Sequence, residues 1–168
     1  MAKWKPRPHR HLGRVVASVE EHHAETRRSV RENIGEDREI RATPAWQIPI
    51  SAILTEIVTP HREGLEDPNS PDDLSALTNL ATMAWNLSRL LRGTDERAKR
   101  EAMAGWDKLP SVSPALAAIA DVMLAQASVL HPDDTRFIVR ADVVMKNGQP
   151  FIHAASTPGA AAQGAGAR

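Results

Sequence analysis

Hydrophobic and polar residues repeat every three to four positions along most of this chain, and at every second position in one segment near its end. The first spacing is typical of amphipathic helices and the second of strands. We therefore expect a mainly α protein that closes with a β-hairpin. The expected helices run from Val15 to Asn33, from about Pro49 to Pro60, from Ser70 to Gly93, from Thr94 to about Asp107, and from Ser113 to Pro132.

The segment between Ser70 and Gly93 has the strongest helix signals. Ser70 suits an N-cap, Pro71 suits the first turn, and Gly93 suits a C-terminal stop. Its apolar sector is wide, so we expect a central helix contacted on several sides. That sector contains Leu74, Leu77, Leu80, Ala81, Ala84, Trp85, Leu87, Ser88 and Leu91. In the preceding helix, Pro60 is expected to end or kink the chain.

Residues 137–155 predict a two-stranded antiparallel hairpin. Two apolar runs flank Asn147-Gly148, a pair that tolerates the positive φ angles of a two-residue turn. This turn sets the register and places Asp142 opposite His153. Because an isolated hairpin is marginally stable in water, this one must lie on helices or pair with another strand.

Alternation divides the hairpin into two faces. The apolar face, expected to pack on the helices, carries Phe137, Val139, Ala141, Val143, Met145, Ile152 and Ala154. The mixed face carries Ile138, Arg140, Asp142, Val144, Phe151, His153 and Ala155. Two interpretations of the mixed face stay open. Asp142 and His153 form an ordinary cross-strand pair, or the face and the strand edges dock a second chain. In the second case the partner-binding residues are Arg140, Asp142, Phe151 and His153.

Composition narrows the function classes. The 168 residues are 42% hydrophobic, which is enough for one domain with a core, and the net charge of zero argues against a surface that binds nucleic acid or anionic lipid throughout. The absence of cysteine excludes disulfides, thiolate zinc sites and cysteine nucleophiles, and it suits a reducing cytosol. No apolar run is long enough to span a membrane, so we expect a cytoplasmic protein.

The chain divides into three parts. Residues 1–14 form a basic, proline-interrupted arm that we expect to be disordered. Residues 15–156 are expected to form a single domain of four to five helices in a bundle-like arrangement, with the hairpin at 137–155. Residues 157–168 are a low-complexity segment rich in alanine and glycine, also expected to be disordered.

The basic arm suggests nucleic-acid binding as an alternative function. It interleaves five cationic side chains with one ring that can stack on a base. The candidate residues are Lys3, Trp4, Lys5, Arg7, Arg10 and Arg14. The other interpretation is a solvated basic leader, because the body of the chain offers no basic patch that continues it.

Signals for catalysis are weak. The sequence contains no P-loop, dinucleotide-binding glycine motif, nucleophile elbow or His-Glu-x-x-His motif. Glu20 and His23 have the Glu-x-x-His spacing of di-metal carboxylate bundles, but such sites need a second copy, which is absent. A metal-dependent enzyme is therefore a third and weakest hypothesis, and we expect no cofactor and no built metal site.

Trp85 and Asn86 lie together on the central helix. We interpret Trp85 as a core residue whose indole N–H bonds a carbonyl or hydroxyl, and Asn86 as a buried hydrogen-bonding group.

The order of elements along the chain resembles that of small uncharacterised bacterial proteins with an Ile-Pro-led helix, an Ala-Trp-Asn central helix, a Pro-Asp-Asp turn and a closing hairpin. Here these elements are Ile48-Pro49, Ala84-Trp85-Asn86, Pro132-Asp133-Asp134 and Arg136 to Ser156. The resemblance implies a helical domain with a hairpin and no particular activity.

The first hypothesis for function is therefore a non-enzymatic cytosolic interaction or accessory protein. Its partner is an unidentified protein or a second copy of the chain, bound through the hairpin. Nucleic-acid binding through the arm is the alternative.

Overall fold

The computed structural model describes residues 24, 28, 43–45, 47–65 and 67–157. Over these residues the protein is mainly α and closes with a two-stranded antiparallel hairpin, which confirms the expected fold class. The helices are α2 (Ile50–Arg62), α3 (Pro71–Arg92), α4 (Glu96–Trp106), α5 (Leu109–Val112) and α6 (Pro114–Val129), and the strands are β1 (Ile138–Lys146) and β2 (Gln149–Ser156). The predicted arm, nearly all of the predicted helix at 15–33, and residues 158–168 lie outside the described residues.

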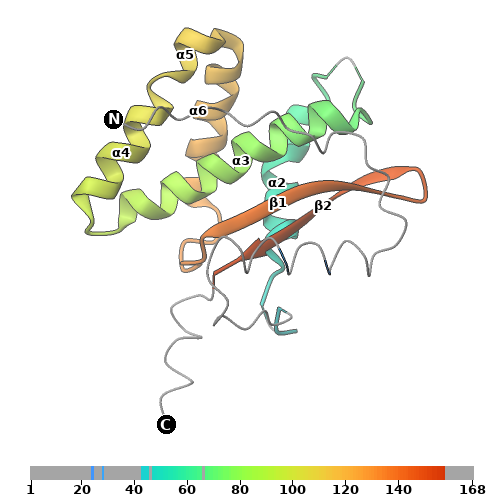
Figure 1. Ribbon diagram of the computed structural model, residues 1–168, viewed down its shortest axis with the longest axis horizontal. Helices are drawn as coiled ribbons and strands as arrows, with labels where there is room; N and C mark the ends of the chain where they lie inside the picture. The colour runs from blue at the N-terminus through green and yellow to red at the C-terminus, as the bar shows by residue number, and fades with distance from the viewer. Residues whose placement is uncertain (1–23, 25–27, 29–42, 46, 66, 158–168) are drawn as a thin grey trace.

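Helix α3 crosses the molecule and contacts the other main elements, as its wide apolar sector predicts (Figure 1). The Oγ atom of Ser70 accepts a hydrogen bond from the backbone N–H of Asp73 at 3.3 Å, which confirms the predicted N-cap. Leu80 and Leu87 are buried and widen the sector as expected. The prediction that Leu91 belongs to this buried sector is wrong, because the residue is 41% exposed at the end of the helix.

The hydrophobic core lies where α2, α3 and α6 meet beneath the hairpin. Its fully buried side chains come from all three helices and include Ile53, Ile57, Trp85 and Met123. Ala81, Ala84, Ala120 and Ala127 are 0% exposed, so α3 and α6 approach closely through small side chains.

Helix α2 continues past Pro60, the residue predicted to end or kink it. Pro60 lies in the last turn, and the helix ends two residues later, at Arg62. A proline has no N–H to bond the carbonyl of Glu56 one turn earlier. The side chain of Gln126 on α6 donates to that carbonyl at 3.3 Å instead. The packing of α6 therefore compensates for the proline.

The remaining helix starts agree with sequence to within one residue. Asp95, rather than Thr94, caps α4 by accepting from the backbone N–H groups of Arg97 and Ala98. Ser113 caps α6, as predicted, by accepting from Leu116. The short helix α5 carries no periodic apolar pattern and was not predicted.

The hairpin has the predicted turn and register. Asn147 and Gly148 both have positive φ angles, of 53° and 77°, and Asp142 lies opposite His153. Members of the predicted apolar face pack in or against the core, namely Ala141, Val143, Ile152 and Ala154. The prediction is wrong at the start of β1, where a β-bulge between Ile138 and Arg140 shifts the alternation. As a result Ile138 is in the core and Val139 is 37% exposed.

None of the helices within the described ranges is both long enough and apolar enough to cross a membrane.

Candidate functional site

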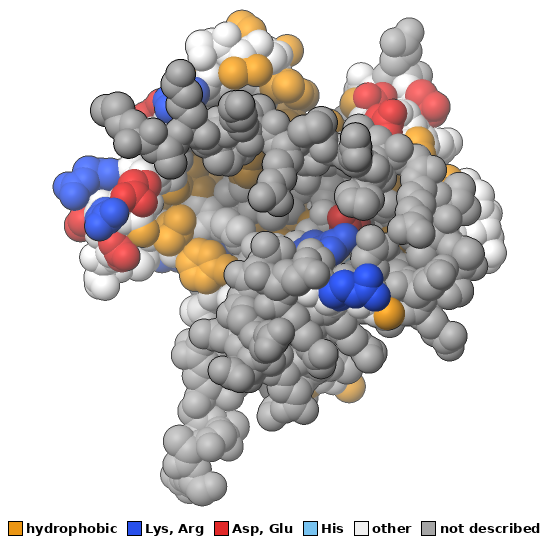
Figure 2. Space-filling view, viewed as in Figure 1, with side chains coloured by type: hydrophobic (Ala, Val, Ile, Leu, Met, Phe, Trp, Pro, Cys, Tyr) orange, Lys and Arg blue, Asp and Glu red, His pale blue; other side chains and the backbone are white. Residues whose placement is uncertain are grey.

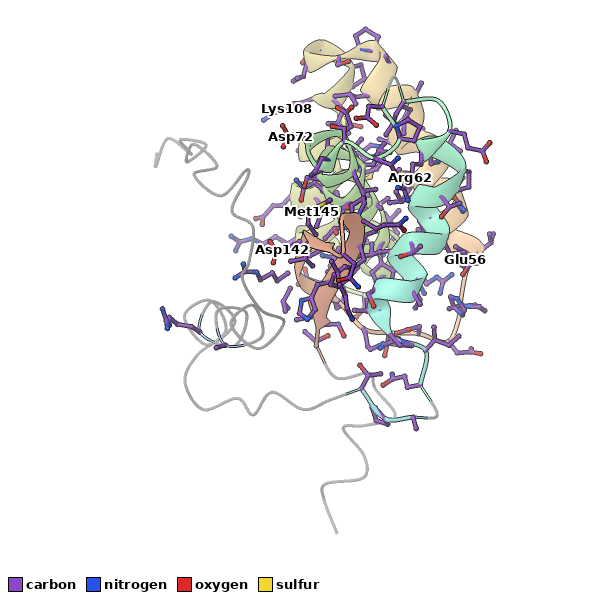
Figure 3. All side chains as sticks on the ribbon, turned by 90° about the vertical axis from the view of Figure 1, so that its right-hand side faces the viewer. Glu56, Arg62, Asp72, Lys108, Asp142 and Met145 are labelled. Atoms are coloured by element: carbon purple, nitrogen blue, oxygen red, sulfur yellow. The ribbon has the colours of Figure 1, made fainter. Side chains whose placement is uncertain are left out.

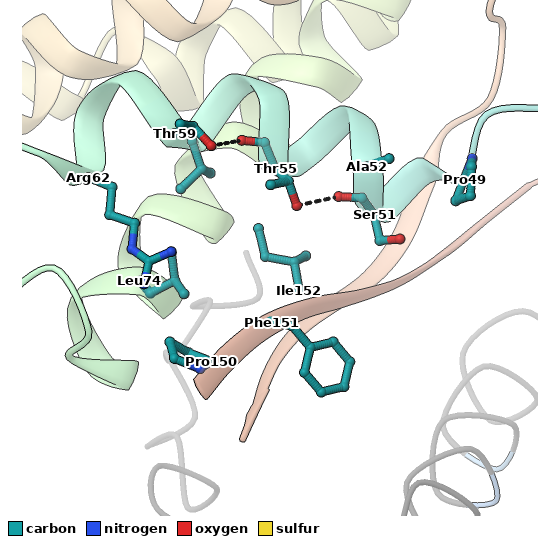
Figure 4. A pocket seen from close by; sticks show the side chains of 11 residues that line it. Pro49, Ser51, Ala52, Thr55, Thr59, Arg62, Leu74, Pro150, Phe151 and Ile152 are labelled. Carbon is teal, nitrogen blue, oxygen red and sulfur yellow. Dashed lines mark hydrogen bonds between the residues drawn. The ribbon is translucent and has the colours of Figure 1, made fainter. Parts of the chain in front are cut away.

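A groove lies between α2 and β2, and it is the candidate binding site (Figure 4). Its cavity has a volume of about 260 Å³ and is open on one side. Small-molecule sites are usually enclosed and measure about 300–1,000 Å³. The groove is therefore somewhat smaller and more open than a usual small-molecule site. Its lining residues are Pro49, Ser51, Ala52, Thr55, Val58, Thr59, Arg62, Leu74, Pro150, Phe151 and Ile152.

The helical wall of the groove is a row of hydroxyl groups. Ser51, Thr55 and Thr59 are spaced four residues apart and so lie one above another on one face of α2. The Thr55 hydroxyl donates to the Ser51 carbonyl at 2.8 Å, and the Thr59 hydroxyl donates to the Thr55 carbonyl at 2.7 Å. Because each threonine proton is used within the helix, the two hydroxyl oxygens face the groove as acceptors.

The strand wall of the groove is the outer edge of β2. In an antiparallel pair, hydrogen-bonded and non-hydrogen-bonded residue pairs alternate. Pro150 has no N–H, so its pair with Met145 is of the second kind, and so are the pairs of Ile152 with Val143 and of Ala154 with Ala141. The backbone N–H and C=O groups of Ile152 and Ala154 therefore point away from β1. Within the described part of the chain they make no hydrogen bond to another element.

At the start of β1, the backbone groups on the outer edge of the strand are already hydrogen-bonded. The Asn86 side chain on α3 donates to the Ile138 carbonyl and accepts from the Ile138 N–H, both at 2.8 Å. One asparagine amide thus takes the place of a neighbouring strand. This confirms the prediction that Asn86 is a hydrogen-bonding group, although the residue is half-buried rather than buried.

One end of the groove is formed by Arg62. Its guanidinium donates to the carbonyl of Pro68 at 2.5 Å and to the side chain of Asn69 at 2.8 Å. These bonds hold the arginine against the loop before α3. The rest of the lining carries no charged side chain, so a segment that occupies the groove need not be charged.

The predicted partner-binding residues share one face of the hairpin, and only Phe151 among them lines the groove. Phe151 lines the groove and is 36% exposed. Asp142 lies on the side of the hairpin away from α2, the helix that ends at Arg62 (Figure 3). Arg140 donates to Asp142 at 2.5 Å along the same strand. Arg140, Asp142 and His153 are not among the residues that line the groove, and Val144 on the same mixed face is buried.

Arg89 on α3 is a buried charge that sequence reasoning missed. It is 5% exposed and stacks on the Trp85 ring, 3.9 Å from the ring centroid. Its donors bond the carbonyls of Ala127, Leu130, His131 and Asp134 and the hydroxyl of Ser88. Burial, and then the nearby charge of Arg92, lower the pKa of Arg89 to about 10, so it stays protonated at neutral pH.

All five guanidinium N–H groups of Arg89 are used by these bonds. The four carbonyl acceptors lie at and beyond the C-terminal end of α6, where unpaired carbonyls favour a cation. Arg92 adds bonds to the carbonyls of Ser128 and Pro132. This cluster fastens the end of α6 to α3 and leaves no donor of Arg89 for a ligand. One feature of the sequence could have indicated that Arg89 is buried: it follows Trp85 by four residues and so lies on the apolar side of α3.

A buried ion pair between Arg136 and Asp134 holds the segment between α6 and β1 in place. Arg136 is 3% exposed and binds the carboxylate of Asp134 through two of its nitrogens, while also donating to the Ile48 carbonyl at 2.8 Å. The Arg136 carbonyl accepts the Trp85 indole N–H at 2.8 Å, which confirms the prediction for that tryptophan. Burial raises the pKa of Asp134, but the hydrogen bonds and charge of Arg136 outweigh burial and lower it overall.

The other chemical candidates are not brought together. Across residues 43–157, apart from 46 and 66, no three His, Cys, Asp or Glu side chains are grouped so that they could hold a metal ion. Glu20, His23 and the basic arm residues lie outside the described residues. His131 follows α6, and its ring nitrogen Nε2 lies 3.4 Å from the Glu56 carboxylate.

Comparison of the chain with protein-family models, with curated proteins and with solved structures finds no match.

Proposed function

We propose that this protein is a non-enzymatic interaction module that binds an extended segment of a partner protein in the groove between α2 and β2. The observation that carries the proposal is the outer edge of β2, where the outward backbone groups of Ile152 and Ala154 border a groove. A partner strand placed beside β2 pairs with these groups, which is the β-augmentation mode of peptide recognition.

The chemistry of the groove defines the partner segment. Ser51, Ala52 and Thr55 give the helical wall small side chains, so a strand beside β2 can lie over α2 with its inward side chains between them. A third strand would also stabilise a sheet that now has two, since two-stranded sheets are marginal on their own. The segment is expected to be extended, uncharged and free of proline at its pairing positions.

The edge of β2 carries no charged side chain that would oppose such pairing. Exposed edges are commonly blocked by lysine or other charges, and Gln149–Ser156 contains no Lys, Arg, Asp or Glu. By contrast β1 carries Arg140, Asp142 and Lys146. Pro150 removes one donor near the turn and leaves the donors at Ile152 and Ala154.

The proposal also covers the arrangement of the helices and the cellular location of the protein. We propose a bundle-like arrangement of four to five helices around α3, because α2, α4 and α6 all contact it. A cytosolic location suits a chain without cysteine. Self-association through the hairpin, and nucleic-acid binding by the arm, stay as alternatives.

A photoreactive benzoylphenylalanine in place of Phe151 tests the groove in the native host. Leu91 is the matched control, because it is 41% exposed against 36% for Phe151 and lies at the far end of α3. We expect discrete cross-linked products from position 151 only. Equal products from both positions, or none from position 151, would overturn the proposal.

Ala154→Pro supplies a second test on the same cross-link. It removes an outward N–H without breaking the β1–β2 ladder, as Pro150 already does on this strand. We expect unchanged circular dichroism and loss of the position-151 products. Ala155→Pro removes an inward N–H and should unfold the hairpin instead. Products that persist in a folded Ala154→Pro variant would refute strand pairing.

A further inference from the structure

Helix α6 is apolar on two opposite sides. One side packs on the core through Ala117, Ala120, Met123 and Ala127. The other side is exposed and consists of Ala115, Ala118, Val122, Ala125 and Val129. We call this second set the α6 stripe. A helix that is hydrophobic all round is usually buried, so an exposed apolar stripe on such a helix is a candidate contact surface.

The exposure of the α6 stripe is large. Val122 is 56% exposed and Val129 is 74% exposed. Val112 on α5 adds another apolar side chain, 78% exposed, beside the start of α6, where Figure 2 shows hydrophobic side chains gathered. A single exposed valine is ordinary, but a continuous row along a whole helix marks an interaction surface.

The spacing of the stripe is that of a helix–helix seam. Its members follow one another at intervals of three, four, three and four residues, which is the a/d pattern of a coiled coil. Alanine at three of the five positions lets two helix axes approach closely. The stripe therefore fits another helix better than it fits a strand or a small ligand.

We infer that the occupant is the α6 stripe of a second copy of this chain, packed antiparallel about a two-fold axis near Val122. The stripe contains no charged residue, so two copies meet without like charges opposed. The antiparallel arrangement also places the N-terminus of each helix beside the C-terminus of the other, which their dipoles favour. A two-fold contact uses the same patch on both subunits. Around Val122 the inner members of the stripe on both sides are alanines, Ala118 and Ala125, and the outer members are Ala115 and Val129.

A membrane surface is a poorer fit to the same stripe. Helices that lie on membranes carry lysine and arginine on their polar face. Helix α6 has no basic residue, and its one charged residue, Asp121, accepts a hydrogen bond from the Trp106 indole at 2.9 Å. The inference is independent of the groove between α2 and β2, which lies on other elements.

Sedimentation velocity of the full chain, from about 1 to 500 μM, tests for the weak dimer that a contact of one helix pair predicts. We expect a concentration-dependent shift from monomer to dimer. Val122→Lys should abolish the shift, because it sets two ammonium groups together at the axis, and lysine keeps the helix. Ala104→Lys, an exposed site on α4 with the same charge change, should leave it intact.

Cysteine cross-linking fixes the orientation, since the natural chain contains no cysteine. A thiol cross-linker about 10 Å long, the width of a helix, should join Val122→Cys to itself. Val129 lies about 10 Å further along α6, so two Val129→Cys thiols would be about 20 Å apart and should not be joined. A monomer at every concentration, or equal cross-linking at both positions, would overturn the inference, whereas photo-cross-links from position 151 to other proteins would leave the groove proposal standing.

Discussion

Replacing Asn86 by alanine should loosen the hairpin from α3. The side chain makes two hydrogen bonds of 2.8 Å to the backbone of Ile138, a residue that is 4% exposed. A buried backbone group left without a partner costs about 1–3 kcal/mol. Because Asn86 is only half-buried, water reaches the truncated site, and we expect a loss of about 2–4 kcal/mol for the two groups together.

Thermal and urea unfolding measure this loss. For a chain of this size, 3 kcal/mol corresponds to a fall in Tm of about 6–12 °C. Hydrogen exchange adds a local readout, because the Ile138 amide should exchange faster in Asn86→Ala than in the natural protein. Asn79→Ala, an exposed asparagine on the same helix, should change the free energy of unfolding by less than about 0.5 kcal/mol.

Asn86→Asp separates the two bonds. A carboxylate accepts from the Ile138 N–H but cannot donate to the Ile138 carbonyl, so at neutral pH the variant should be less stable than the natural protein. Protonation restores an O–H donor, and the difference in stability should shrink as the pH falls below the pKa of the new carboxyl. The reasoning is refuted if Asn86→Ala loses less than about 1 kcal/mol, or if the Asn86→Asp difference is independent of pH.

Three further predictions concern other contacts. Asp134→Asn should cost about 2–4 kcal/mol at neutral pH by leaving Arg136 buried without its carboxylate. The pKa of Asp134 is lowered in the folded state. The stability that its carboxylate contributes is therefore complete above the unfolded-state pKa of about 3.9, and it is lost as the pH falls through the folded-state pKa. A difference in urea denaturation between Asp134→Asn and the natural protein that does not depend on pH would contradict the pairing. Trp106→Phe should cost about 1–3 kcal/mol by deleting the bond to Asp121, and a double-mutant cycle with Asp121→Asn should show coupling. If the arm of residues 1–14 binds single-stranded RNA through all five of its cations, log affinity should fall with log salt at a slope of about −3.5, and deletion of the arm should remove binding.

Local signals in the sequence predicted the parts of the fold that depend on neighbouring residues. Ser70, Ser113 and the Asn147-Gly148 turn act within four residues of themselves, so their chemistry identifies a helix start or a turn without knowledge of the rest. The hairpin register followed from the turn alone. The bulge after Ile138 did not follow, because it arises where Asn86, far away in sequence, binds that residue.

The polar anchors of the core could be predicted only in part. Trp85 and Asn86 were recognised as inward-facing, but their partners are backbone groups, which every residue possesses and no side-chain pattern reveals. Arg89 was missed for the same reason, since four of its five acceptors are carbonyls. The candidate groove depends on how α2 lies against β2, and only the tertiary arrangement brings its hydroxyl row to the strand edge.

The distance along the chain between α3 and its anchors has a consequence during synthesis. Asn86 and Ile138 are 52 residues apart, and at about 5–20 residues per second the second is made roughly 3–10 s after the first. Over most of that interval Asn86 and the indole of Trp85 lack their native partners, and Arg89 has only the hydroxyl of its neighbour Ser88, while the apolar sector of α3 is already complete. The helix therefore emerges from the ribosome before it can be buried, and folding of this domain must wait until β1 has been translated.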